Sequence, residues 1–211
     1  MGFFLKKQIS KTCQIGIWQI KEDYKTLFSS LNLNEEDKST LENFKNEKRK
    51  IEWLSVRFLL KKLIGKEMQI LYKKSGQPFI KNSSISISIT HTKDLVGIIL
   101  NEKGKVGIDV EFMSEKIGRI ALRFLSQKEL KDIDFNQRIK HLYLHWCAKE
   151  TLFKVYEDRA LEFKENLKIL NFKVNEEGTF EGIIDKNNIK EKYILNYFVK
   201  NNFVVVWTFV D

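Results

Sequence analysis

The stretch "KVGIDVEFM", residues Lys105–Met113, decides how the middle of this chain folds. Its alternating pattern predicts a β-strand, because side chains two positions apart point to the same side of a strand. One face would carry Val106, Ile108, Val110 and Phe112. The other face would carry Gly107, Asp109 and Glu111. Two neighbouring carboxylates repel each other, and a bound cation would remove that repulsion. The pair is therefore either a divalent-metal site or an ordinary solvated strand face.

Helices and strands follow one another on both sides of this stretch. Hydrophobic spacing predicts helices over 34–44, 46–65, 125–133 and 137–157. Gly65 suits the end of the second helix, and Ser126 with Glu129 forms a capping box at the start of the third. Further strands are predicted over 12–20, 84–92, 94–100, 166–174, 178–184, 192–199 and 203–209. Each half thus has a long helix followed by several strands, which indicates an α+β pseudo-repeat.

Composition limits the class of partner. The chain has 211 residues, of which 43% are hydrophobic, so it can form a sizeable core. Its net charge of +9 favours nucleic acid, a phosphorylated ligand, an anionic membrane or an acidic protein. Cys13 and Cys147 fit no disulfide framework or metal-ligand spacing, which favours a reducing cytoplasm. No apolar run approaches the roughly 18 residues that cross a bilayer, and the first residues lack a signal-peptide pattern.

A third carboxylate lies in the segment "HWCAKETLFK", residues 145–154. On the predicted helix, Trp146, Lys149, Glu150 and Phe153 share an arc of about 100°. Lys154 follows Glu150 by one turn, so the two form either an ordinary surface pair or a metal ligand beside a phosphate-binding cation. Three carboxylates with room for water and phosphate oxygens would suit Mg²⁺.

Two other features are candidates for binding phosphate. His91 ends a predicted strand between Thr90 and Thr92, where a structural role is the alternative. The helix over 46–65 and its flanks hold Lys45, Lys48, Arg49, Lys50, Arg57, Lys61, Lys62 and Lys66. A solvated helix face explains most of the lysines. Arg49 and Arg57 are better candidates, because a guanidinium binds phosphate through two parallel hydrogen bonds.

These motifs together resemble a known family. "VGIDVE", followed about 35 residues later by "WCAKETLFK", resembles the paired signature of the 4′-phosphopantetheinyl transferase superfamily. "EWLSVR", "SGQPFI" and "SITHT" resemble further motifs of its larger, monomeric, surfactin-synthetase-activating branch, and "FLSQKEL" resembles the segment between the signatures. The resemblance covers roughly residues 46–156.

The resemblance implies an α+β fold with a pseudo-twofold arrangement of two similar halves, each a long helix packed on a mainly antiparallel sheet, with the active site between them. The expected N-terminal half is 1–104 and carries the nucleotide-binding motifs. The expected C-terminal half is 105–211 and carries the metal-binding strand and helix. The two halves would be tightly joined.

The resemblance also implies a reaction, the transfer of the phosphopantetheine arm of coenzyme A to a serine of an apo acyl or peptidyl carrier protein, with release of 3′,5′-ADP. Mg²⁺, or Mn²⁺ in its place, would be held by Asp109, Glu111 and Glu150. Lys154 would contact a phosphate, and Glu150 or a metal-bound water would accept the serine proton. Coenzyme A would be bound by Arg57, Gly76, Pro78, His91, Asp109 and Lys154, and Arg49, Thr90, Glu129 and Lys149 are further candidates for the site.

Some residues depart from or add to this pattern. Gln77 stands where the family often has lysine, so one phosphate contact is missing unless Lys73, Lys74 or Lys81 supplies it. Gly107 is expected to leave room for the pyrophosphate. Carriers of this class are acidic, which suits a basic enzyme. We expect a cytoplasmic monomer without a nucleic-acid or membrane partner.

Three other functions are compatible with parts of the sequence. A basic nucleic-acid-binding module would explain the charge and the aromatic residues, but it leaves the three carboxylates unexplained. A non-catalytic homologue would bind only coenzyme A or a carrier protein. A metal-dependent nuclease or phosphatase would use the same three carboxylates but not the other motifs.

Overall fold

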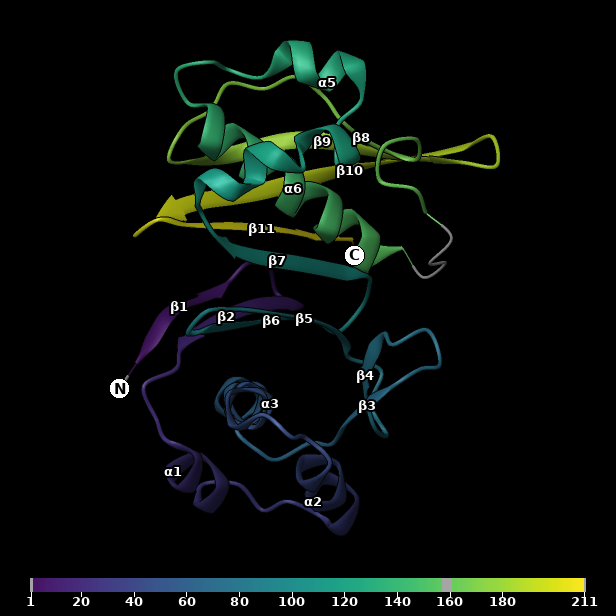
Figure 1. The fold of residues 1–211 in the computed structure, drawn as a ribbon. Coiled ribbons are helices and arrows are strands. Elements are labelled where there is room, and N and C mark those ends of the chain that lie inside the picture. Colours follow the sequence, from purple (N-terminus) through teal and green to yellow (C-terminus); the bar gives the residue numbers. More distant parts are fainter. Residues whose placement is uncertain (1, 157–160, 211) are drawn as a thin grey trace. The chain divides into compact units, whose positions relative to one another are not determined.

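The computed structural model describes residues 2–156 and 161–210. The chain divides into two compact units, Met1–Glu102 and Lys103–Asp211, and each is described by itself. Figure 1 shows the elements of both units along the chain. Among the described residues, no helix combines the length and the apolar character needed to cross a membrane.

The first unit combines a four-stranded sheet, a small hairpin and three helices. In chain order these are β1 (Phe3–Gln8), β2 (Cys13–Gln19), α1 (Tyr24–Ser29), α2 (Glu35–Glu42), α3 (Glu47–Ile64), β3 (Ile70–Tyr72), β4 (Pro78–Ile80), β5 (Ser86–Thr92) and β6 (Leu95–Asn101). The sheet has the order β1-β2-β6-β5, and all its neighbouring strands are antiparallel. β3 and β4 form a separate two-stranded sheet.

Helix α3 is the centre of the first unit. Its buried Leu59 and Leu60 pack with strand residues such as Ile98, so the helix lies against the sheet. Its other side packs on α1 and α2 through a second cluster, and Figure 1 shows these two helices on the side of α3 away from the sheet. The helix ends at Gly65, whose φ of +83° favours glycine, as the sequence predicts.

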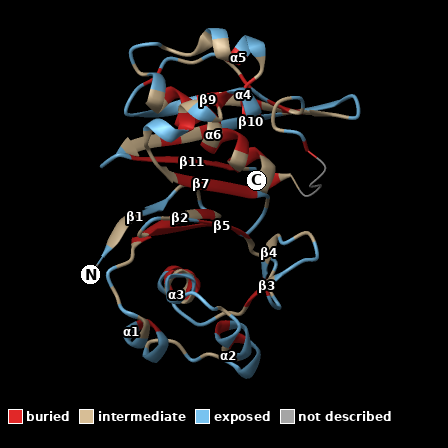
Figure 2. Cartoon of the chain, viewed as in Figure 1, coloured by how far each residue is buried: buried red, intermediate tan, exposed pale blue. Residues whose placement is uncertain are grey.

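The second unit has one five-stranded sheet and one long helix. In chain order its elements are β7 (Val106–Phe112), a 3₁₀ helix η1 (Glu115–Arg119), α4 (Ala121–Phe124), α5 (Gln127–Asp132), α6 (Arg138–Val155), β8 (Leu167–Ile169), β9 (Glu177–Lys186), β10 (Ile189–Lys200) and β11 (Phe203–Phe209). The sheet order is β7-β11-β10-β9-β8, and every pair is antiparallel. α6 packs on β7 and β11, and Figure 2 shows both strands buried along most of their length.

The predicted α+β class and the antiparallel sheets with helices packed on them are confirmed. The topology also repeats. In the first unit, strand β2 precedes the long helix and later pairs with the second strand of the hairpin β5–β6. In the second unit, β7 precedes α6 and pairs with the second strand of the hairpin β10–β11. The predicted repeat began with the long helix. The structure shows that the repeat also includes a strand before that helix, β2 in the first unit and β7 in the second.

Most element boundaries differ from the predictions only at the ends. The predicted helix 137–157 is α6 at Arg138–Val155, and Glu157 lies outside the described residues. The predicted strand 166–174 is wrong for most of its length, because only Leu167–Ile169 pairs with β9, as β8. The capping box of Ser126 and Glu129 is present at α5. No strong sequence pattern marks β1, a partly exposed edge strand, or α1, which has only six residues.

Candidate active site

The acidic face of strand β7 lies against helix α6, and Gly107 sets how closely they approach. A Cβ atom at Gly107 would lie 2.4 Å from the carbonyl oxygen of Thr151 and 2.6 Å from a methyl of Val155. Because such contacts are too short, only glycine allows this packing. The space beside Gly107 is therefore filled by helix α6, and the prediction that it receives a pyrophosphate is wrong.

Asp109 and Lys154 form an ion pair across this contact. Lys154 Nζ donates to Oδ1 of Asp109 at 2.7 Å and to the carbonyl oxygen of Ile108 at 2.9 Å. Asp109 is 5% exposed, so water screens this pair only weakly. The structure thus brings the predicted phosphate-binding lysine and a predicted metal ligand into direct contact.

Glu111 contacts an aromatic residue of α6. The indole Nε1 of Trp146 donates to Oε1 of Glu111 at 3.3 Å. The Trp146 ring packs in turn on Phe124 and Phe163, with ring centroids 5.2 and 5.7 Å away. Trp146 therefore joins the carboxylate of Glu111 to an aromatic cluster. The sequence did not predict this hydrogen bond, because the contact depends on the relative position of strand and helix.

Glu150 is the third carboxylate of the group. Burial and the negative charges of Asp109 and Glu111 raise the pKa of Glu150 to about 7, although the Lys154 ammonium opposes the shift. Glu150 also lines a pocket of about 400 Å³. The other residues of that pocket are Ile120, Arg123, Phe124, Trp146 and Phe163. A carboxyl group that titrates near neutral pH in such a pocket can exchange a proton with a bound reactant.

The predicted metal ligands are neighbours but do not form a ready metal site. In residues 2–156 and 161–210, no group of three or more histidine, cysteine, aspartate or glutamate side chains is arranged to hold a metal ion. Lys154 places a positive charge next to Asp109 instead. The donor chemistry still fits a hard divalent cation, since the three neighbouring side chains are all carboxylates and their repulsion is visible in the raised pKa of Glu150.

Glu129 and Lys149 are buried together beside this group. Lys149 Nζ, with a side-chain exposure of 0%, donates to Oε2 of Glu129 at 2.9 Å and to the carbonyl oxygens of Phe124 and Phe163. Glu129 Oε1 accepts from the backbone N–H of Ile169 at 2.9 Å. These bonds use all three donors of the ammonium group. The pair therefore ties α5 and β8 to α6, and the geometry gives both residues a supporting role.

In the first unit, Arg49 and His91 lie together. Arg49 Nη1 is 2.8 Å from His91 Nε2, and Glu52 Oε2 is 3.4 Å from the same Arg49 atom and 3.7 Å from His91 Nδ1. Because arginine only donates, Nε2 is the acceptor and Nδ1 carries the hydrogen in this arrangement. Thr90, the neighbour of His91, is buried in β5. Arg49 and His91 form a partly exposed group with Glu52, and the phosphate-binding role of His91 stays a prediction.

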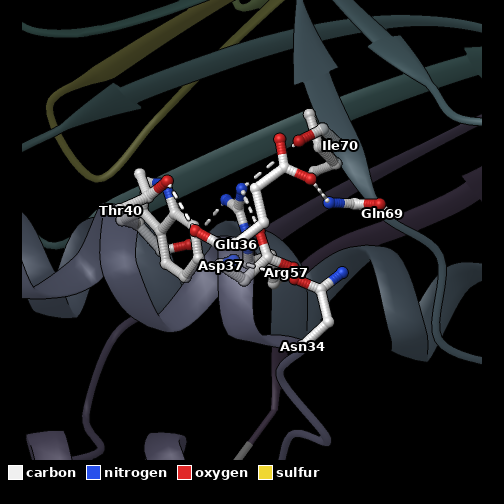
Figure 3. A network of polar contacts seen from close by, with 8 residues as sticks. Asn34, Glu36, Asp37, Thr40, Arg57, Gln69 and Ile70 are labelled. Atoms are coloured by element: carbon white, nitrogen blue, oxygen red, sulfur yellow. Dashed lines mark hydrogen bonds and ion pairs between the residues drawn. The ribbon is translucent and has the colours of Figure 1, made fainter.

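Arg57 lies elsewhere in the first unit, and its predicted phosphate contact stays a prediction. Its side chain is 5% exposed, its guanidinium lies 3.1 Å from the centroid of the Trp53 ring, and Nη2 is 3.3 Å from Asp37 Oδ1. Figure 3 shows this network of α2, α3 and the start of β3 from close by. Nη2 also donates to the carbonyl oxygen of Ile70 at 3.4 Å. The guanidinium is thus engaged internally, and Arg49 is the arginine beside His91.

Gly76 and Pro78 belong to the hairpin of β3 and β4. Gly76 has a φ of +75° and donates its N–H to the carbonyl oxygen of Lys73 at 2.7 Å, while Pro78 begins β4 opposite Tyr72. The two residues shape this turn, as predicted. Their predicted place beside an adenine ring stays a prediction.

Part of the chain is similar to known proteins. The sequence profile of the 4′-phosphopantetheinyl transferase superfamily matches residues 105–207. A putative 4′-phosphopantetheinyl transferase of Haemophilus influenzae is 31% identical over 107 residues, which are 46% of this chain and 46% of that protein. The 4′-phosphopantetheinyl transferases AcpT of Salmonella typhi and Escherichia coli O157:H7 are 28% and 22% identical over 112 residues, which are 50% of this chain and 58% and 57% of those proteins. The chain spans about half the length of the curated relatives it matches.

The second unit is thus an α+β domain with three neighbouring carboxylates beside a lysine. Residues 105–207 match the profile of the 4′-phosphopantetheinyl transferase superfamily, which confirms the resemblance of the two signature motifs. The match does not distinguish branches of the superfamily, so the larger, monomeric branch stays a prediction.

Proposed function

We propose that this protein transfers the 4′-phosphopantetheine group of coenzyme A to a serine of an apo carrier protein. The observation that carries the proposal is the ion pair of Asp109 and Lys154 beside Glu150, in a domain of the transferase superfamily. The three charged side chains combine what a phosphoryl-type transfer needs, namely a cation for phosphate and a proton acceptor.

The reaction requires little covalent chemistry from the protein. The serine Oγ attacks the phosphorus that bears the pantetheine arm, and an Oγ–P bond forms. The bond between the attacked phosphorus and the bridging oxygen of the pyrophosphate breaks. The bridging oxygen keeps the electron pair and leaves as part of 3′,5′-ADP. The serine proton passes to a base of the protein. Positioning and charge neutralisation supply most of the rate enhancement in such transfers.

Glu150 is the proposed base. Its pKa of about 7 means that about half of the side chains are ionised at neutral pH, which is the range in which a general base is most effective. It lines a largely apolar pocket, in which an acceptor serine could approach the carboxylate. The alternative acceptor is a water molecule.

Lys154 and the carboxylates handle the phosphate charge. Lys154 can turn from Asp109 toward a phosphate oxygen, because its ammonium is on a flexible stem and 25% of its side chain is exposed. Mg²⁺, which Mn²⁺ could replace, would be held by Asp109, Glu111 and Glu150. When bound, it would neutralise the pyrophosphate and the charge that develops on 3′,5′-ADP.

Arg49 and His91 are the proposed ligands of the nucleotide phosphates. Both side chains are partly exposed, and together they offer the fork of N–H donors of a guanidinium and an imidazole ring. Arg49 takes the place that the sequence pattern gave to Arg57. Gly76 and Pro78 would shape the turn next to the adenine.

The proposed acceptor is an acidic acyl or peptidyl carrier protein. A chain with a net charge of +9 attracts an acidic partner at long range, which raises the association rate. We expect a cytoplasmic monomer with no nucleic-acid or membrane partner.

The released nucleotide provides a test of this proposal. Coenzyme A and a panel of apo carriers would be incubated with the protein and Mg²⁺, and the nucleotides separated by chromatography. Release of 3′,5′-ADP that requires an apo carrier is expected. Release without a carrier would indicate a hydrolase, and no release with any carrier would contradict the transferase proposal.

A further inference from the structure

Two histidines in helix α6 are buried in the core of the second unit. His141 and His145 are one helical turn apart, each is 1% exposed, and their ring centroids lie 5.0 Å from each other. Phe172 packs on both rings, at 4.7 and 5.6 Å, and stacks on Phe180 at 4.1 Å. Neither histidine takes part in the proposed reaction, so their burial requires another explanation.

The hydrogen bonds of His141 require a neutral ring. The backbone N–H of Asp134 donates to Nδ1 of His141 at 3.0 Å, so this nitrogen must carry a lone pair. A proton on Nδ1 would break this bond and place two donors against each other. Nε2 of His141 has no hydrogen-bond partner among the described residues. The bond to Asp134 holds the loop between α5 and α6 against the helix.

The surroundings of His145 are even less suited to a positively charged ring. Neither of its ring nitrogens has a hydrogen-bond partner in the described part of the chain. The nearest carboxylate oxygen, Oε1 of Glu129, is 4.0 Å from Nδ1 and already accepts the N–H of Ile169. The ammonium of Lys149, one turn along the same helix, is paired with the other oxygen of Glu129. A second positive charge would therefore compete with Lys149 for one carboxylate.

We propose that His141 and His145 form a pH-sensitive switch in the second unit, which holds helix α6 in its packed position only while both rings are neutral. Below neutral pH the two histidines bind protons in the unfolded chain but not in the packed core. Acid therefore favours a form in which α6 has left its packed position. The same helix carries Trp146, Glu150 and Lys154 in its next turns. Opening of α6 therefore removes these side chains from β7. This inference does not depend on the proposed transferase activity.

The charges around the pair decide the direction of the response. Burial lowers the pKa of His141, although Asp134 and Asp132 oppose the shift. Burial, His141 and Lys149 lower the pKa of His145 well below its ordinary value. Phe172, which packs on both rings, and Phe180, which stacks on Phe172, are uncharged. Because a histidine with a lowered pKa binds its proton more readily in the unfolded state, stability is complete above about pH 6.5 and is lost as the pH falls below it.

The test compares unfolding of the full chain between pH 7.5 and pH 5. The wild-type unfolding constant is expected to rise by up to about tenfold per pH unit for each histidine that stays neutral in the folded state. The variant His141→Asn/His145→Phe keeps an acceptor near the N–H of Asp134 and removes both titrating rings, so its response should be much flatter. The matched control is His91→Asn, which removes the third histidine of the chain and should keep the wild-type response.

A direct measurement covers the case in which the double variant does not fold. The chain has three histidines, so the ring signals in an NMR titration of the wild-type protein can be assigned by single substitutions. The proposal predicts that His141 and His145 stay neutral down to the pH at which the α6 amides lose their protection from hydrogen exchange. Titration of both rings near pH 6.5 without such a loss would overturn it, as would an unchanged pH response in the folded double variant.

Discussion

Lys154 Nζ lies 2.7 Å from Oδ1 of Asp109, so a cation supplied by the chain itself already sits among the carboxylates of the second unit. The lysine is therefore in a position to turn from Asp109 toward a phosphate, and Asp109, Glu111 and Glu150 would be the residues to hold a divalent cation. The proposed mechanism thus combines the metal-binding and phosphate-binding roles in one place.

Lys154→Ala is expected to lower kcat about 100-fold or more, in the range seen when one charge-stabilising group is removed. Some loss of stability is also expected, because Asp109, which is 5% exposed, loses its ion-pair partner. Lys154→Arg keeps the charge and is the matched control. A kcat close to wild type in the alanine variant would contradict the phosphate contact; the melting temperature shows whether any loss comes from unfolding.

Gly107→Ala should disturb the contact of β7 with α6. The new methyl group would lie 2.4 Å from the Thr151 carbonyl oxygen, so the helix must move away from Asp109 and Glu111. We expect a destabilisation of about 1–3 kcal/mol, as for overpacked cores, together with a larger loss of activity. Gly178→Ala in β9 is the control, because its added methyl meets the Tyr197 ring at 3.3 Å and no backbone atom within the nearest contacts. Equal effects of the two variants on activity would refute the spacing role.

Arg49→Ala and Arg57→Ala should behave differently. Loss of Arg49 removes an exposed donor beside His91, so KM for coenzyme A should rise about tenfold, as for one charge-assisted hydrogen bond, with little change in melting temperature. Loss of Arg57 leaves Asp37 buried without its partner and removes the contact with Trp53, so it should destabilise the chain by about 3 kcal/mol.

The two arginine variants can be separated by steady-state kinetics and chemical denaturation of the same samples. A coenzyme A analogue that lacks the 3′-phosphate would show whether Arg49 contacts that group. If it does, the KM values of Arg49→Ala and the wild type should differ less with this analogue than with coenzyme A. If Arg57→Ala instead raised KM for coenzyme A without loss of stability, the result would support a phosphate contact by Arg57.

The activity should depend on the ionisation of Glu150. Because its pKa is about 7, kcat/KM should rise between pH 6 and pH 8 as the carboxylate forms. For stability the sign is opposite, because a carboxyl with a raised pKa binds its proton more tightly in the folded state; its contribution to stability falls as the pH rises from about 4.5 to about 7.

Mg²⁺ should move the Glu150 titration to lower pH, since a nearby cation favours the ionised form. The measurement is kcat/KM as a function of pH at several Mg²⁺ concentrations. Glu150→Gln, which lacks the titrating group, is the control. A profile that Mg²⁺ does not shift would contradict Glu150 as a metal ligand.

Glu129 and Lys149 should act on stability and not on chemistry. Lys149→Met leaves the buried carboxylate of Glu129 without its cation, which should cost about 3–5 kcal/mol. The double variant Lys149→Met/Glu129→Gln should recover part of that loss. In samples that remain folded at low temperature, kcat should stay within a few-fold of wild type. A large loss of kcat with an unchanged melting temperature would give the pair a direct role in the reaction.

Much of the second unit could be predicted from sequence because its signals are local. The alternation of β7 and the one-turn spacing of Glu150 and Lys154 place three carboxylates and a lysine near each other. The capping box at Ser126 and, in the first unit, the left-handed backbone conformation of Gly65 are also set by neighbouring residues. Such features depend on neighbouring residues, so the folded chain reproduces them.

Contacts between distant elements were harder to predict. The hydrogen bond of Trp146 to Glu111 and the filling of the space at Gly107 depend on how α6 lies on β7. The choice between Arg49 and Arg57 depends on which face of α3 is covered by α2, and helix periodicity alone does not give that. An acid such as Asp37, near the start of a short preceding helix, was a possible signal for a buried arginine partner.

The most direct test of the account is the intact mass of an apo acyl carrier protein after incubation with coenzyme A, Mg²⁺ and this protein. The account predicts a gain of one phosphopantetheine group on the carrier with the wild-type chain and little or none with Glu150→Gln. The gain should also disappear when the acceptor serine of the carrier is replaced by alanine. An unchanged carrier mass with the folded wild-type chain, across acyl and peptidyl carriers, would contradict the central claim.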